Sequence, residues 1–240
     1  MQHPDIPQSR FRQLPLGFEP RDVFTFESFV VGENKVPVGL VQQCALGEGE
    51  KQIYIWSAAG CGKSHLLQAA CNLAAKNHRT VCYLPAGELM TQSVQSLDEL
   101  EQIDLVCLDD VEHMAKMPDW EEALFDLINR IREASGNLLM SASVSPDEMN
   151  PGLQDLRSRL MWGPVFQLQT LKDAEKFEAL RLRAHQRGLE LPQNVAEYLM
   201  THFPRDLFGL FERLDKLDKA SLAMQRRLTV PFVKSVLGKE

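Results

Sequence analysis

The feature of this 240-residue chain that most constrains its fold is an apolar run that leads through a glycine-containing turn into a helical pattern. Residues 53–56 (IYIW) are continuously apolar, and the turn after them contains Gly60 and Gly62. From Lys63 to Lys76 apolar residues recur with the 3.6-residue period of a helix. A short, continuously apolar strand is typical of a parallel sheet that is buried on both faces. The run therefore predicts a strand–turn–helix unit of an α/β protein.

Strand and helix patterns alternate along the first 170 residues. The predicted strands are residues 53–56, 80–84, 105–108, 137–143 and 165–168. The helical patterns between and before them are residues 35–46, 63–76, a short helix at 87–95, and 120–131. This alternation predicts an α/β fold with a parallel five-stranded sheet.

After Thr170 the patterns are helical only, at 172–187, 192–202, 205–221 and 230–237. The charge changes near the same point: residues 1–170 hold 13 basic and 23 acidic side chains, and residues 171–240 hold 13 and 10. Prolines and the lack of helical periodicity predict an extended segment at the start of the chain. We therefore expect an extended tail at 1–22, an α/β domain at 23–170 and a small all-α domain at 171–240.

The turn after the first strand resembles a phosphate-binding loop. Its residues are Ser57, Ala58, Ala59, Gly60, Cys61, Gly62, Lys63 and Ser64. They match the pattern G-x-x-x-x-G-K-[ST] except at the first position, where Ser57 replaces glycine. Glycines let backbone N–H groups approach phosphates, Lys63 supplies a point charge, and Ser64 offers a hydroxyl to Mg²⁺. The strand–loop–helix context favours nucleotide binding over the alternative, an ordinary turn that enters a helix.

A second candidate for nucleotide chemistry is the acidic end of the strand at 105–108. Asp109 and Asp110 directly follow this apolar run. Carboxyl ends of parallel strands lie at the ligand-binding edge of an open α/β sheet. Asp109 is predicted to hold Mg²⁺, and Asp110 takes the position of a general base. The alternative is a pair of solvated acids, and the short Asp110 side chain predicts slow hydrolysis by the chain alone.

Composition excludes several other classes of protein. The net charge of −7 does not favour a general duplex-DNA binder. The five cysteines have no CxxC spacing, so reduced thiols and a cytoplasmic location fit better than a disulfide framework or a zinc site. The N-terminus has no apolar signal region, and no apolar stretch approaches 18 residues, so no membrane contact is expected.

Four segments in the expected order resemble the DnaA branch of the AAA+ ATPases, across about residues 23–238. They are the loop and helix start at 60–67 (GCGKSHLL), the adenine-contacting segment at 25–32 (TFESFVVG), the arginine-finger box at 156–163 (LRSRLMWG) and the start of the sensor 2 helix at 203–208 (FPRDLF). The resemblance implies a P-loop AAA+ core followed by a helical lid domain. It also implies bound ADP or ATP with Mg²⁺.

The resemblance assigns further residues to the nucleotide. Those expected to contact it, besides the loop at 57–64, are Phe29, Val30, Val31, His65 and the sensor 2 residue Arg205. The alternative for Arg205 is an ion pair with Asp206 or Asp173. Arg159 is implied as a finger that reaches a neighbouring protomer's nucleotide, with a surface ion pair as its alternative. Ser143 is implied as sensor 1, where relatives have Asp, which weakens the expectation of strong turnover.

The tail contains a short motif of a different kind. Residues 13–18 (QLPLGF) match Q-x-x-[LMI]-x-[FY], the peptide that docks bacterial sliding clamps. Gln13 would hydrogen-bond at the rim of the clamp pocket, Leu14 lies within the motif, and Leu16 and Phe18 would be the buried anchors. The expected partner is the DNA polymerase III β sliding clamp. The alternative is a tail that packs on its own domain.

Together these features imply a negative regulator of DNA replication initiation. The chain stops at Glu240, after the helical lid, without the DNA-binding domain that DnaA carries, so no sequence-specific DNA binding is expected. The expected mechanism is stimulation of the hydrolysis of DnaA-bound ATP by Arg159 in trans, with DnaA as partner and self-association through head-to-tail surfaces. The alternatives are a helicase loader of the DnaC type and a small-molecule P-loop kinase.

Overall fold

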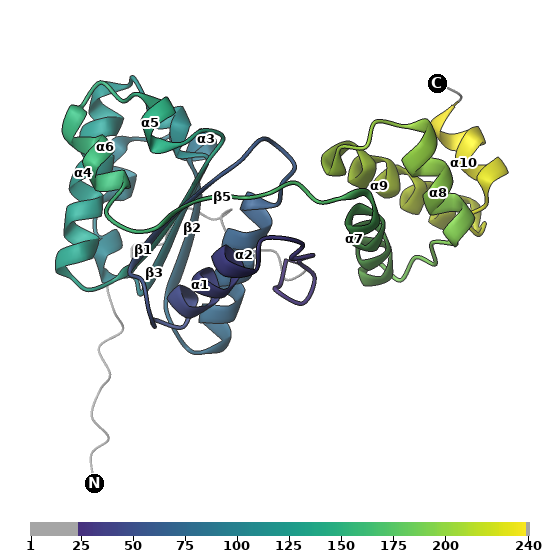
Figure 1. Cartoon of the computed structure of the whole chain (residues 1–240), viewed down its shortest axis with the longest axis horizontal. Coiled ribbons are helices and arrows are strands. Elements are labelled where there is room, and N and C mark those ends of the chain that lie inside the picture. Colours follow the sequence, from purple (N-terminus) through teal and green to yellow (C-terminus); the bar gives the residue numbers. More distant parts are fainter. Residues whose placement is uncertain (1–23, 239–240) are drawn as a thin grey trace, which may run out of the picture.

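The computed structural model describes residues 24–238, which form an α/β domain and, beyond it, a bundle of helices (Figure 1). The strands are β1 (Gln52–Trp56), β2 (Val81–Pro85), β3 (Leu105–Asp109), β4 (Asn137–Ala142) and β5 (Val165–Gln167). The α-helices are α1 (Lys35–Ala45), α2 (Lys63–Lys76), α3 (Ala86–Leu89), α4 (Pro118–Glu133), α5 (Pro146–Met149), α6 (Gln154–Leu160), α7 (Asp173–Gln186), α8 (Gln193–His202), α9 (Leu207–Met224) and α10 (Val230–Leu237). Short 3₁₀ helices are η1 (Val94–Leu97), η2 (Leu100–Gln102) and η3 (Val111–Met114).

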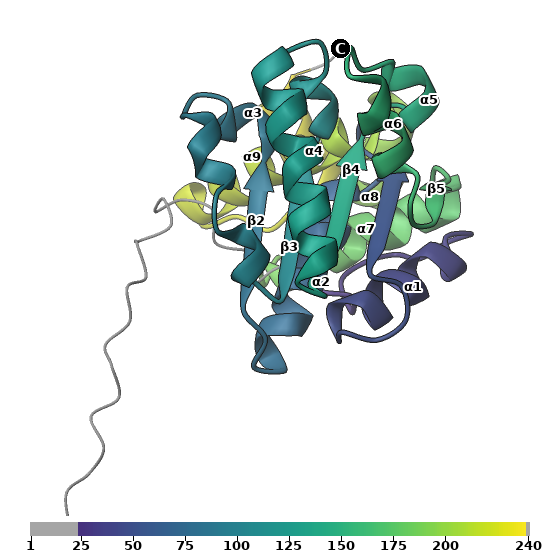
Figure 2. The ribbon, with the colours of Figure 1, turned by 90° about the vertical axis from the view of Figure 1, so that its left-hand side faces the viewer.

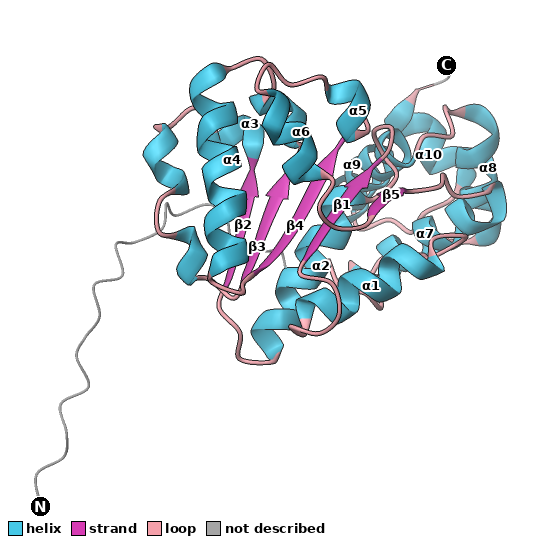
Figure 3. Ribbon diagram, turned by 60° about the vertical axis from the view of Figure 1, so that its left-hand side comes forward, coloured by secondary structure: helices cyan, strands magenta, loops and turns pink. Residues whose placement is uncertain are grey.

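The five strands form one parallel sheet in the order β2-β3-β4-β1-β5 (Figure 3). Helices α1 and α2 cover one face, and α3, α4 and α6 cover the other; Figure 2 looks onto the face covered by α4. Because side chains alternate along a strand, each strand contributes to both faces. Tyr54 is buried in the core beneath α4, whereas its neighbours Ile53 and Ile55 are buried in the core beneath α2. The predicted α/β fold with a parallel five-stranded sheet is confirmed.

The helices after the sheet have a hydrophobic core of their own. Leu180, Leu199, Leu210 and Leu214 are fully buried there, one or more from each of α7, α8 and α9. Helix α9 begins at the side chain of Asp206, which accepts from the Gly209 N–H at 2.6 Å. The expected all-α lid after the α/β core is therefore present. Among the described residues, no helix combines the length and the apolar character needed to cross a membrane.

Two expectations about local structure were wrong, and two short helices were not predicted. The strand at 137–143 ends at Ala142, so Ser143 lies beyond it. The short helix at 87–95 is replaced by α3 and the 3₁₀ helix η1, whose start is capped by Ser93. Helices α5 and α6 had no prediction, because four and seven residues are too few for a periodic pattern; a Ser145–Glu148 capping box starts α5.

The end of α6 is tied to the start of β1 by a close backbone approach. Gln52 Nε2 donates to the carbonyl oxygens of Arg159 at 2.7 Å and Leu160 at 3.3 Å, which are among the last carbonyls of α6. The chain then passes so near Gln52 that a Cβ atom on Gly163 would overlap the Gln52 carbonyl group. Only glycine fits at position 163, and this approach fixes where α6 ends.

We expect Gly163→Ala to lower the free energy of unfolding by about 2–3 kcal/mol, because the added methyl group has to displace backbone. Gly39 is the matched control, since it lies inside α1 with open space around its Cα. Gly39→Ala should raise the free energy of unfolding by about 0.5–1 kcal/mol through helix propensity. Urea unfolding followed by circular dichroism measures both, and equal effects of the two variants would contradict the close approach.

Candidate nucleotide-binding site

The carboxyl ends of β1 and β3 and the loop after β1 meet beneath the lid, where the structure has a cavity of about 380 Å³. Its lining includes Phe24, Ser28, Phe29, Val30, residues 59–65, Asp110, Leu171, Ala179, Arg183, Gln186, Leu207, Phe208 and Phe211. Residues from the N-terminal segment, the loop, β3 and the lid thus surround one space. This brings together most of the residues that the sequence assigns to a nucleotide.

The loop has the backbone that close approach to phosphate requires. Gly60 and Gly62 have φ angles of 82° and 92°, in the left-handed region that favours glycine. A Cβ atom on Gly62 would lie 2.8 Å from Cε2 of Phe29, so this ring packs directly on the loop. Gly62 is also the N-cap of α2 and supplies no side-chain cap. The N–H groups at this helix end therefore favour an anion.

Lys63 is buried and directs its ammonium group onto the loop. Its Nζ donates to the Ser57 carbonyl at 2.9 Å and lies 3.5 Å from that of Ala58. Ser57 itself is buried, its backbone N–H donates to the Ala142 carbonyl at 3.2 Å, and its φ angle is not positive. Serine is therefore accommodated where the common loop pattern has glycine.

His65 ties the N-terminal segment to the start of α2. Its Nε2 lies 2.9 Å from the Thr25 carbonyl and 3.1 Å from Ser28 Oγ. The ring also packs against Phe24 and, edge-on, against Phe29. Burial lowers the pKa of His65 and keeps the ring neutral. The histidine therefore positions the segment that carries Phe29 and Val30 at the cavity, while Val31 packs into the core behind it.

The acid at the end of β3 is held by two hydroxyl groups. Asp109 is buried, and its carboxylate accepts from Tyr83 Oη at 2.6 Å and from Ser141 Oγ. Ser141 Oγ in turn accepts from the Asp110 N–H at 3.1 Å. Burial, and next to it the Asp109 charge, raises the pKa of the Tyr83 hydroxyl, which also lies within hydrogen-bonding reach of Ser64. Ser64, Tyr83 and Asp109 thus form one cluster of oxygen atoms, the donor type that Mg²⁺ prefers.

Asp110 lines the cavity in a backbone conformation with a φ of 56°. Burial raises the pKa of its carboxyl group, and the negative charges of Asp109 and Glu112 raise it further. Lys63 acts in the opposite direction but does not cancel these effects. This environment therefore disfavours the ionised form of the Asp110 carboxyl group.

The hydrogen bond of Ser143 goes to Glu112 rather than to Asp109 or Asp110. Its backbone N–H donates to Glu112 Oε1 at 2.8 Å, beyond the end of β4. The serine that reaches Asp109 is Ser141, two residues earlier, which the sequence analysis missed together with Tyr83. Each is a hydroxyl-bearing residue inside a segment that the sequence predicts as a strand, and this was the available signal.

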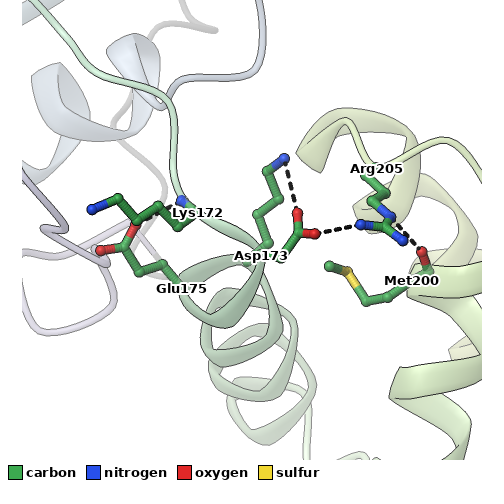
Figure 4. A network of polar contacts seen from close by, with 6 residues as sticks. Lys172, Asp173, Glu175, Met200 and Arg205 are labelled. Atoms are coloured by element: carbon green, nitrogen blue, oxygen red, sulfur yellow. Dashed lines mark hydrogen bonds and ion pairs between the residues drawn. The ribbon is translucent and has the colours of Figure 1, made fainter.

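Arg205 is bound to the start of α7 and the end of α8. Figure 4 shows its guanidinium group directed at Asp173, the first residue of α7, and at the carbonyl of Met200, to which its Nε donates at 3.0 Å. Asp173 also lies 3.7 Å from Lys176 Nζ. The alternative expected from sequence, an ion pair with Asp173, is therefore what this structure contains. The arginine that lines the cavity is Arg183 of α7, which the sequence analysis also missed.

Arg159 lies on α6 and does not line the cavity. Its Nε donates to Asn129 Oδ1 of α4 at 2.9 Å, and its guanidinium group lies 3.9 Å from the centre of the Trp162 ring. Nearby Arg157 is paired with Asp147 at 2.5 Å. The predicted clamp-binding residues Gln13, Leu14, Leu16 and Phe18 lie outside the described residues.

A parallel sheet with a phosphate loop after its interior strand β1, a buried acid at the end of β3 and a helical lid over the loop defines an AAA+ protein of the P-loop class. The family follows from comparison with known sequences. Residues 21–167 match the model of the bacterial DnaA ATPase domain, and residues 173–237 match that of the Hda lid domain. The chain belongs to the DnaA ATPase-domain family and is an Hda-like, DnaA-related AAA+ protein.

Similar proteins agree with this assignment. An uncharacterized protein of Haemophilus influenzae is 43% identical over 229 residues, which are 95% of this chain and 99% of that protein. Domain III of the replication initiation protein DnaA from Thermotoga maritima has a TM-score of 0.82 at 22% identity, covering 90% of this chain and 96% of that one. AMPPCP-bound DnaA from Aquifex aeolicus has a TM-score of 0.70 at 23% identity, covering 84% and 67%. These two structures share the fold.

We expect Asp110→Asn to raise the free energy of unfolding by about 0.5–1 kcal/mol near neutral pH, measured by urea unfolding with EDTA and without nucleotide. Because the folded state raises the pKa of Asp110, ionisation of this group destabilises the fold. That cost is complete above the raised pKa and vanishes as the pH falls to the ordinary range of Asp. Asparagine removes the charge and tolerates the positive φ.

The stabilisation by Asp110→Asn should therefore shrink as the pH is lowered. Asp126→Asn is the matched control, since Asp126 is exposed in the middle of α4. It should change the free energy of unfolding by less than about 0.5 kcal/mol. A destabilised Asp110→Asn variant would contradict the unfavourable environment of this carboxylate.

Proposed function

We propose that this chain binds an adenine nucleotide and is a negative regulator of DNA replication initiation that stimulates hydrolysis of DnaA-bound ATP. The observation that carries the nucleotide site is the phosphate loop with Lys63, open to a cavity beneath the lid. The family supports the regulatory role, because a DnaA-type ATPase domain is joined here to an Hda-type lid. The AMPPCP-bound structure of a DnaA with this fold supports adenine as the base.

Some residues of the cavity are proposed to bind the phosphates of the nucleotide, and others its base. Loop N–H groups and the Lys63 ammonium would bind phosphate oxygens, in exchange for the loop carbonyls that Lys63 now contacts. Phe29 and Val30 would contact the nucleoside, on a segment that His65 holds in place. Ser64 and Asp109 would hold Mg²⁺, which when bound neutralises phosphate charge.

Hydrolysis by the chain alone is proposed to be slow. A general base has to be ionised, and the surroundings of Asp110 disfavour its ionised form. Ser143 contributes its backbone N–H to Glu112, and Arg205 is paired with Asp173. With these groups engaged elsewhere, the chain is better suited to retaining ADP or ATP than to turning it over.

Arg159 is proposed to act on the nucleotide of a neighbouring DnaA molecule. It lies outside the chain's own cavity, on α6, which the Gln52 contacts hold firmly. An arginine supplied in trans stabilises the charge that develops during phosphoryl transfer. Head-to-tail contact of this kind also allows self-association.

The N-terminal tail is proposed to bind the sliding clamp. Gln13, Leu14, Leu16 and Phe18 would dock on the β sliding clamp and bring the regulator to replicated DNA. The net charge of −7 argues against direct sequence-specific DNA binding. Free thiols on all five cysteines support action in the cytoplasm, where DnaA works.

We expect Lys63→Ala to weaken binding of ADP and ATP about 10- to 100-fold, because a charge-assisted contact to phosphate is worth about 1.5–3 kcal/mol. Lys76→Ala is the matched control: Lys76 is exposed at the other end of the same helix, α2. Isothermal titration calorimetry with each nucleotide should find the control within twofold of the unaltered chain. Unchanged affinity in Lys63→Ala would contradict the phosphate site.

The regulatory role is tested by hydrolysis of ATP pre-bound to DnaA, with this protein, ADP and clamp-loaded DNA. Arg159→Ala should lower the stimulated rate about a thousandfold, while nucleotide and clamp binding persist. Arg157→Ala is the matched control, because Arg157 lies on the same helix and is engaged in an exposed ion pair with Asp147, and it should retain stimulation. A variant without Gln13, Leu16 and Phe18 should lose the clamp-dependent part. No stimulation by the unaltered chain would overturn the regulator and favour testing a DnaC-type helicase loader.

A further inference from the structure

The sequence at the end of the lid is basic. Between Asp218 and Glu240 it contains no acidic residue, and its basic residues there are Lys219, Arg226, Arg227, Lys234 and Lys239. The last acids before this stretch, Asp215 and Asp218, lie 2.7 and 3.6 Å from Arg187, which compensates their charge. Exposed charges farther away than about 10 Å are largely screened at 0.1 M salt. The net charge of −7 therefore does not describe this end of the molecule.

The connection from α9 to α10 presents Arg226 and Arg227 on an ordered backbone. Gln225 ends α9 as its C-cap, with a φ angle of 51° that turns the chain. The Arg226 N–H then donates to the Ser221 carbonyl at 3.1 Å, and Ser221 Oγ donates to the Arg226 carbonyl at 2.5 Å. Leu228, directly after the two arginines, is buried in the lid core. The backbone is thus held by contacts in which the guanidinium groups take no part.

The charges of these two arginines are uncompensated. Both side chains are exposed, and within residues 24–238 neither Arg226 nor Arg227 belongs to an ion pair. Arg181 of the same domain is exposed too, but it is paired with Glu178 at 3.4 Å. A guanidinium group without a carboxylate partner is available to an external anion, and its planar fork of donors suits phosphate oxygens.

Arg226 and Arg227 line a hollow at the end of the lid, which we call the lid hollow. Its volume is about 530 Å³, no acidic side chain belongs to its described lining, and the polar residues there are Gln225, Arg226, Arg227, Thr229 and Ser235. Thr229 Oγ accepts from the Phe232 N–H at 3.3 Å, so its own O–H remains a donor. Figure 1 shows α10 on the side of the lid away from the sheet, and the lid hollow is separate from the nucleotide cavity.

We propose that the lid hollow is a sequence-independent contact for the phosphate backbone of duplex DNA, made by Arg226 and Arg227. Arginine, glutamine and threonine side chains are among the donors that proteins direct at DNA phosphates. Such contacts carry no sequence information, so any duplex should bind. Two phosphate contacts give weak binding, which gains weight when the protein is held near DNA by another interaction.

A lipid surface also presents phosphate, but the apolar side chains here do not suit it. Phe232 and Val233 of α10 are buried in the lid core and offer no apolar face to a bilayer. Leu222 and Met224 at the end of α9 are exposed, by 73% and 58%, but two side chains are too few to anchor a helix in a membrane interface. A hollow lined by guanidinium groups favours a strand of phosphates instead.

The direct test is fluorescence anisotropy of two labelled duplexes of unrelated sequence, each about 30 base pairs long, titrated with the full chain at several salt concentrations. The two affinities should agree within about twofold, and the logarithm of the association constant should fall with that of the salt concentration with a slope of about −2. Arg226→Gln combined with Arg227→Gln should weaken binding at least about tenfold at low salt and remove most of this slope.

The matched control removes two arginines whose charges are compensated. Arg157→Gln combined with Arg181→Gln changes the net charge equally, and both residues lie in exposed ion pairs. It should leave the affinity for the duplex within about twofold of the unaltered chain. Thermal unfolding followed by circular dichroism should give the same midpoint for both double variants, because all four side chains are exposed.

Several results would overturn the proposal. An equal loss of affinity in both double variants would reduce the effect to net charge, and a preference for one duplex would remove the sequence independence. Polyglutamate that displaces the duplex at equal concentration of charge would identify an acidic protein segment as the ligand. Tighter binding to phosphatidylglycerol vesicles than to the duplex would identify a lipid surface, and no binding at the lowest salt concentration would leave no site.

This test is independent of the proposed function. The anisotropy experiment contains neither DnaA nor nucleotide nor clamp, so it can succeed when stimulation of DnaA fails, and fail when stimulation succeeds. The tail variant without Gln13, Leu16 and Phe18 should bind the duplex as the unaltered chain does. A loss of duplex binding in that variant would place the contact in the tail and overturn the role of the lid hollow.

Discussion

Much of this structure depends on β1, because the strand pairs with both β4 and β5 and each of its ends supports a different group of residues. Its carboxyl end continues into the loop that carries Lys63. Its amino end places Gln52 against the last carbonyls of α6, the helix of Arg159. Five residues of strand span only about 13 Å between their end Cα atoms. The phosphate loop and the helix that carries Arg159 are therefore both attached to one short interior strand.

Lys63 at the cavity, Arg159 on α6 and Arg205 before α9 differ in which groups contact them, and this difference organises the proposed chemistry. Lys63 rests on loop carbonyls and Arg159 on an amide oxygen and an indole ring, so neither is neutralised by a carboxylate in these contacts. Arg205 is paired with Asp173 and is engaged with the lid's own helix α7. A neutral partner orients a cationic side chain and leaves its charge available to an external anion, whereas a carboxylate partner compensates that charge.

The N-terminal segment connects the parts that border the cavity. His65 holds the Thr25–Phe29 stretch on α2, and the Asn34 side chain bonds both the N–H and the carbonyl of Gln169 in the linker to the lid, at 2.7 and 3.0 Å. Glu33 adds an exposed ion pair with Lys172 at the start of α7. One short stretch of chain thus reaches both the phosphate loop and the start of the lid, which couples the residues proposed to contact the base to the position of the lid.

The sequence by itself determined those features that follow from local patterns of residues. Apolar runs predicted the sheet, helical periodicity predicted α2 and the lid, and the chemistry of Gly60, Gly62 and Lys63 predicted the phosphate loop. Roles that depend on spatial neighbours were missed, as for Ser141 and Tyr83, or were left open between alternatives, as for Arg205. Ser141 reaches Asp109 only because β4 lies beside β3, and Arg205 meets Asp173 only because α7 and α9 pack together. Hydrogen bonds and ion pairs act over a few ångströms, so only tertiary structure decided which polar groups meet.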